Sequence, residues 1–152
     1  MKKIIRYKDK FVKSFLCIAL LLSACGKKED PALPKYKESM EAYTSEICNL
    51  SSSLDSLDPA AEDSVDKLLK TVDELAATLH NMAALEVPDS YSDAGTIAQE
   101  AYNLMNDSAN LYHAAYGSGT YDEQSAEQAQ QQYLNSMQRV SAIGEYLMNT
   151  AE

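Results

Sequence analysis

Apolar side chains recur at alternating spacings of three and four residues through four stretches of the chain. This period brings one side chain per turn onto a single helical face, and no stretch alternates in the manner of a β-strand. The pattern therefore predicts an all-α protein with four amphipathic helices. The four predicted seams are Tyr36, Met40, Tyr43, Ile47, Leu50, Leu54 and Leu57; Val65, Leu68, Val72, Leu75, Leu79 and Met82; Ala94, Ala98, Ala101, Met105, Ser108, Tyr112 and Ala115; and Ala126, Ala129, Tyr133, Ser136, Val140, Ile143 and Leu147.

Short breaks between the seams predict where the helices begin and end. Connections of only a few residues force consecutive helices to run antiparallel. We therefore predict an up-down-up-down four-helix bundle over residues 36–151, with helices of about 22 to 30 residues. The predicted starts are Asp58-Pro59, Ser90 with Asp93, and Thr120 with Glu123, and the predicted stops are Val87-Pro88 and Gly117-Ser118-Gly119.

The four seams differ in side-chain size. The first two carry Leu, Ile, Val and Met, whereas the last two mix Ala, Ser and Tyr into the same positions. Small residues let two helices approach closely, so we expect a tight Ala-rich interface between the third and fourth helices. A cavity between these helices is the alternative.

Residues 1–24 have the organisation of an export signal. They hold six basic side chains and one acid, followed by an apolar run from Phe15 to Leu22. That run is much shorter than the 20 or so apolar residues that a membrane-spanning helix needs, which favours a signal peptide over a membrane anchor.

The signal ends in Leu22-Ser23-Ala24-Cys25, which resembles the lipobox of bacterial lipoproteins. The resemblance implies cleavage after Ala24 and attachment of acyl chains such as palmitate through the sulfur of Cys25. The mature chain is also similar to small all-helical surface lipoproteins. An ordinary secretory signal and an uncleaved anchor are the alternatives.

The lipobox resemblance implies three segments and a location. Residues 1–24 form the signal peptide, residues 25–35 form the lipidated cysteine and a short polar tether, and the bundle follows. Two acyl chains are enough for stable attachment to a bilayer. We expect the protein at the extracytoplasmic face of the cell membrane, held by membrane lipid through Cys25, with an outer membrane as the alternative location.

The chain beyond the signal is strongly acidic. Residues 25–152 carry 7 basic and 22 acidic side chains, a net charge of −15, and from Thr71 onward the only Lys or Arg is Arg139. Such a surface repels nucleic acid, so we expect no nucleic-acid partner, and it attracts cations or basic protein surfaces.

No constellation in the sequence predicts catalysis, a cofactor or a metal site. His80 and His113 each follow a seam residue and should point outward, and neither has metal-ligand spacing. After processing, Cys48 is the one cysteine that the lipid does not modify, and it lies off the seam. We expect a partly covered thiol without a role, with pairing between molecules or oxidation as the alternatives. We therefore expect no enzyme.

Two functions remain consistent with the sequence. The first is a non-catalytic interaction module that docks another envelope protein through a helical face or the acidic surface. The second is a binder of a small ligand or cation, using either the carboxylates or the tyrosines near the end of the third helix. Neither hypothesis fixes the oligomeric state. The tyrosines concerned are Tyr102, Tyr112, Tyr116 and Tyr121.

Overall fold

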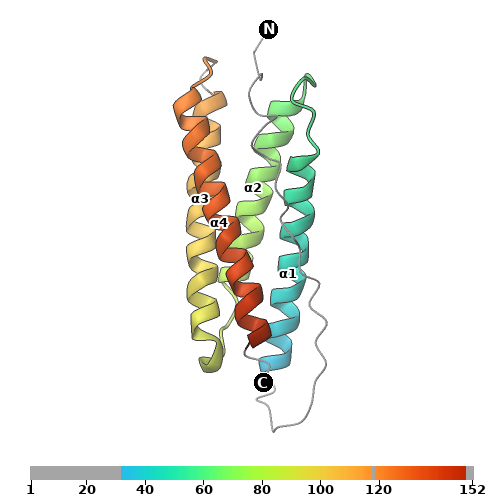
Figure 1. The fold of residues 1–152 in the computed structure, drawn as a ribbon, viewed down its shortest axis with the longest axis vertical. Coiled ribbons are helices and arrows are strands. Elements are labelled where there is room, and N and C mark those ends of the chain that lie inside the picture. Colours follow the sequence, from blue (N-terminus) through green and yellow to red (C-terminus); the bar gives the residue numbers. More distant parts are fainter. Residues whose placement is uncertain (1–31, 118, 150–152) are drawn as a thin grey trace.

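The computed structural model describes residues 32–117 and 119–149, which form four long helices and one short 3-10 helix. Consecutive helices run antiparallel, so that α1 begins and α4 ends at the same end of the bundle (Figure 1). The predicted four-helix bundle is confirmed, and the described residues contain no strand. The elements are α1 (Ala32–Asp55), α2 (Ser64–Ala83), η1 (Asp89–Tyr91), α3 (Ser92–Gly117) and α4 (Glu123–Asn149).

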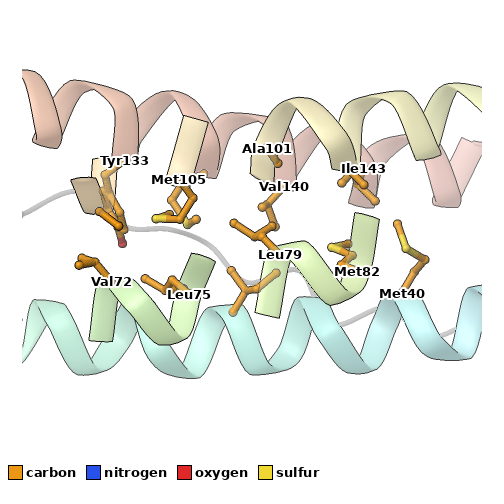
Figure 2. Packing of buried hydrophobic residues seen from close by; sticks show 14 of the residues in the cluster. Met40, Val72, Leu75, Leu79, Met82, Ala101, Met105, Tyr133, Val140 and Ile143 are labelled. Atoms are coloured by element: carbon orange, nitrogen blue, oxygen red, sulfur yellow. The ribbon is translucent and has the colours of Figure 1, made fainter. Parts of the chain in front are cut away.

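The predicted seams supply the core. Every seam position of α3 and α4 is buried, whereas Tyr43, Leu50 and Leu57 near α2 are only half-buried. In Figure 2, Leu79 of α2 lies opposite Val140 of α4, in the middle of the core. Both side chains are at most 1% exposed. The core is therefore continuous from α2 to α4.

α3 and α4 approach each other more closely than any other pair of helices. The Ser108 hydroxyl donates to the carbonyl oxygen of Ala129 at 2.8 Å, and the Ser136 hydroxyl donates to that of Ala101 at 2.7 Å. Each helix thus contributes an alanine and a serine one heptad apart, and the two bonds are reciprocal. Each buried hydroxyl finds a carbonyl acceptor on the facing helix, because the small side chains bring the two backbones close together. The structure has the tight Ala-rich interface that we predicted.

Two of the predicted helix starts are wrong because local hydrogen bonds close a turn first. Asp58 accepts the N–H of Ala60 at 3.0 Å, and α2 begins only at Ser64. The predicted stop at Val87-Pro88 is also wrong, because α2 ends at Ala83. The late start and the early end together leave α2 with 20 residues, fewer than predicted. Asp122, rather than Thr120, accepts the N–H of Gln124 at 3.0 Å at the start of α4.

The predicted cap at Ser90 is also wrong, for a tertiary reason. Residues Asp89–Tyr91 form η1, and α3 begins after it. Tyr91 is 2% exposed and its ring lies 5.5 Å from that of Tyr36 on α1. Burial of this aromatic side chain competes with the local capping pattern. The prediction that α3 ends at Gly117 is confirmed.

Candidate functional site

The predicted lipidation site, Cys25, and the predicted signal peptide lie outside the described residues. α1 begins at Ala32, four residues before the predicted start of the bundle. The end of the bundle where α1 begins is therefore the end connected directly to Cys25. Among the described residues, no helix combines the length and the apolar character needed to cross a membrane.

Three tyrosines close this end of the bundle. The ring of Tyr91 lies 5.5 Å from that of Tyr36 and 6.2 Å from that of Tyr146, and the Lys37 ammonium lies 5.6 Å from the centre of the Tyr91 ring. Burial raises the pKa of Tyr36 to about 12. Sequence reasoning missed this cluster, because Tyr91 and Tyr146 belong to no seam.

The tyrosines proposed as a ligand site do not converge. Tyr112 is 1% exposed, Tyr116 stacks on Tyr121 with ring centres 5.3 Å apart, and Tyr102 packs edge-on against His80 at 5.0 Å. Tyr102 and Tyr116 are fourteen residues apart on one straight helix, or about 21 Å. The structure brings Tyr116 and Tyr121 together, and Tyr102 lies far from them along the helix.

The cations of the bundle are largely occupied by neighbouring acids. Lys67 pairs with Asp63 at 2.9 Å and Lys70 with Glu74 at 3.5 Å, each within one helical turn. Arg139 of α4 pairs with Glu100 of α3 at 3.1 Å. Exposed pairs of this kind contribute little to stability. They do neutralise most of the positive charge locally, and the remaining carboxylates dominate the surface potential.

A stripe of carboxylates runs along α3 on the side that faces α4. Asp93, Glu100 and Asp107 are spaced by seven residues, so they lie on one helical face about 10.5 Å apart. All three are exposed, and only Glu100 has a basic partner among the described residues.

Both histidines are exposed, as predicted. The Nε2 atom of His113 lies 2.9 Å from one carboxylate oxygen of Asp73 on α2 and 3.0 Å from the other. His80 packs against Tyr102. The two imidazoles therefore make contacts between α2 and α3 rather than forming a joint site.

Cys48 is more covered than predicted. It is 8% exposed and therefore buried, whereas we expected a partly covered position.

The junction between α1 and α4 is the loosest contact between neighbouring helices of the bundle. A buried hydrogen bond of 2.7 Å between the hydroxyls of Ser51 and Tyr133 spans it and sets the register of the two helices. Farther along α4, Gly144 is half-buried, yet a methyl group added there would meet no atom within 4 Å. A small side chain would therefore fit at position 144 of α4 without a clash.

Glu41 of α1 carries an unusual carboxylate. The side chain is half-buried, and its Oε1 atom is buried without a hydrogen-bond partner. Buried polar atoms nearly always have a partner, and a carboxylate oxygen without one destabilises the fold. Lys37, one turn earlier, is placed over the Tyr91 ring. Sequence reasoning gave no signal for Glu41.

The described residues contain no group of three or more His, Cys, Asp or Glu side chains arranged to hold a metal ion. No protein-family model, curated protein or solved structure matches the chain.

Proposed function

We propose that this protein is a lipid-anchored, extracytoplasmic interaction module that binds a basic partner protein through its acidic surface and does not catalyse a reaction. The anchor is the lipid on Cys25, and the tether of six residues between Cys25 and α1 keeps the bundle close to the bilayer. The partner is a protein of the same envelope, because the anchor restricts what the bundle can meet.

The observation that carries the proposal is the distribution of charge over a rigid bundle. Three of the five Lys and Arg side chains in residues 32–149 already have acidic partners. The stripe on α3 leaves Asp93 and Asp107 available on either side of the Glu100 pair. A surface of this kind accelerates association with positively charged proteins and repels negatively charged ones.

The test is capture of partners from crosslinked envelopes by the tagged full-length protein at two salt concentrations. Raising the ionic strength from about 10 mM to about 150 mM shortens the screening length from about 30 Å to about 8 Å. We expect capture to fall sharply over this range, and to fall at low salt in a variant with Asp93→Asn and Asp107→Asn.

The matched control keeps the charge and changes only the length of the side chain. A variant with Asp93→Glu and Asp107→Glu should capture the same partner as the parent protein. Capture that is indifferent both to salt and to the amide substitutions would refute the electrostatic basis of the proposal.

A further inference from the structure

The acidic side chains of α4 are confined to its two ends. Residues 128–144, which span about 24 Å of helix, contain no Asp or Glu. The single charged side chain in this stretch, Arg139, is paired with Glu100 of α3. Because residues 25–152 carry a net charge of −15, the middle of α4 is a neutral region on a strongly acidic molecule.

This neutral region has an exposed face, and α4 crosses in front of the other helices in Figure 1. The residues of this neutral face lie opposite the buried seam of α4, and they are Gln131, Leu134, Gln138 and Ser141. Leu134 is 43% exposed and is one of two large apolar side chains that are exposed among the described residues. The other, Tyr121, packs against Tyr116. An apolar side chain in surroundings depleted of charge is typical of the centre of a protein–protein interface.

We propose that the neutral face of α4 pairs two copies of this chain side by side on the membrane. The inference goes beyond the proposed function and rests on its lipid anchor. Both copies are held by one bilayer next to the start of α1, and their negative charge repels them from anionic lipid headgroups. The two bundles therefore stand away from the membrane with their helices in the same direction, and the two-fold axis of the pair runs parallel to them.

A parallel pair needs a face without carboxylates, because each residue lies at the height of its own copy. On the outer face of α3, Asp107 would meet a second Asp107, and such opposed like charges weaken association. On the neutral face, Gln131 and Gln138 each meet their own copy, and an amide both donates and accepts hydrogen bonds. The two Leu134 side chains cover each other between these amides. The neutral face is therefore complementary to itself.

The membrane strengthens a contact that is weak in dilute solution. The amides are hydrated when the copies are apart, so hydrogen bonds between the copies add little net free energy. Tethering confines the copies to one surface in one orientation, which raises their effective concentration. We therefore expect pairs on the membrane and monomers in dilute solution.

The experiment is thiol crosslinking of cysteine variants in membranes of cells that express the full-length protein. Gln131→Cys, Leu134→Cys and Gln138→Cys should each give a crosslinked dimer with a short reagent, because each position meets its own copy. An antiparallel pair centred on Leu134 would instead set Gln131 against Gln138. Asn103→Cys, at an exposed position of α3, is the control and should give no more dimer than the parent chain.

A second experiment adds charge to the neutral face of the Leu134→Cys variant. Gln131→Glu with Gln138→Glu sets carboxylates against their own copies, so the crosslinked dimer should fall by about tenfold or more. The matched control is Asn103→Asp with Asn110→Asp, which adds the same charge at exposed positions of α3 and should leave the dimer unchanged. Both variants should keep the circular dichroism spectrum of the parent.

Three results would overturn the pairing. One is crosslinking by Leu134→Cys that is no greater than by Asn103→Cys, and another is crosslinking by Leu134→Cys without crosslinking by Gln131→Cys and Gln138→Cys. The third is an undiminished dimer after Gln131→Glu with Gln138→Glu. Failure of the proposed function has a different signature, because the protein would then be absent from the membrane fraction, or envelope capture would be insensitive to salt.

Discussion

Leu75 gives the most direct test of how the bundle is held together. This side chain of α2 is 0% exposed and lies in the centre of the strongest apolar seam. Leu75→Ala removes three carbons, at about 0.8 kcal/mol for each, or about 2.4 kcal/mol. The remaining cavity adds to this in proportion to its volume, so we expect a loss of about 2 to 5 kcal/mol in the free energy of unfolding.

The assay is urea unfolding of the full-length protein followed by helical circular dichroism. Leu134→Ala is the matched control, since it is the same substitution at a position of α4 that is 43% exposed. It should change the free energy of unfolding by no more than about 0.5 kcal/mol. A Leu75→Ala variant as stable as the parent, or an equal loss in both variants, would refute the assignment of the core.

Two further perturbations probe particular contacts. Burial, with the charge of Asp55 adding to it, raises the pKa of Tyr133 to about 12 from its ordinary 10.0, although the Ser51 hydrogen bond lowers it. The folded protein therefore favours the neutral phenol of Tyr133. The contribution of this residue to the free energy of unfolding is fully present below pH 10.0 and is lost as the pH rises toward 12. Tyr133→Phe should reduce this loss of stability at alkaline pH, as measured by unfolding experiments. Gly95→Ala places a methyl group 2.7 Å from a methyl of Val87, so it should lower the melting temperature of the protein. Adding Val87→Ala to this variant removes the clashing methyl groups and should reverse the effect.

The sequence predicted the core better in α3 and α4 than in α1 and α2. Every position of the last two seams is buried, and α3 and α4, which carry small residues in these seams, make the most extensive contact in the bundle. In the first seam, Leu50 of α1 and Leu57, which follows the end of α1, share the period but are only half-buried. Periodicity identifies the face of a helix but not how closely its neighbour approaches.

The helix ends and the position of Tyr91 depend on interactions that a linear pattern does not contain. Asp122 and Thr120 are both good cap residues, and it is the carboxylate of Asp122 that accepts the N–H of Gln124. Tyr91 enters the core through contacts with residues far away in sequence. Glu41 reads as one more surface carboxylate in the sequence, whereas in the structure its Oε1 atom is buried.

The central claim is the lipid anchor, and the mass of the mature protein tests it most directly. Protein purified from membranes should begin at Cys25 and carry a diacylglyceryl group on its sulfur, detected by mass spectrometry of the N-terminal peptide. Cys25→Ala should abolish both the lipid and the membrane fraction. A wild-type protein that begins at another residue, or that carries no lipid and is found in the medium, would contradict the account.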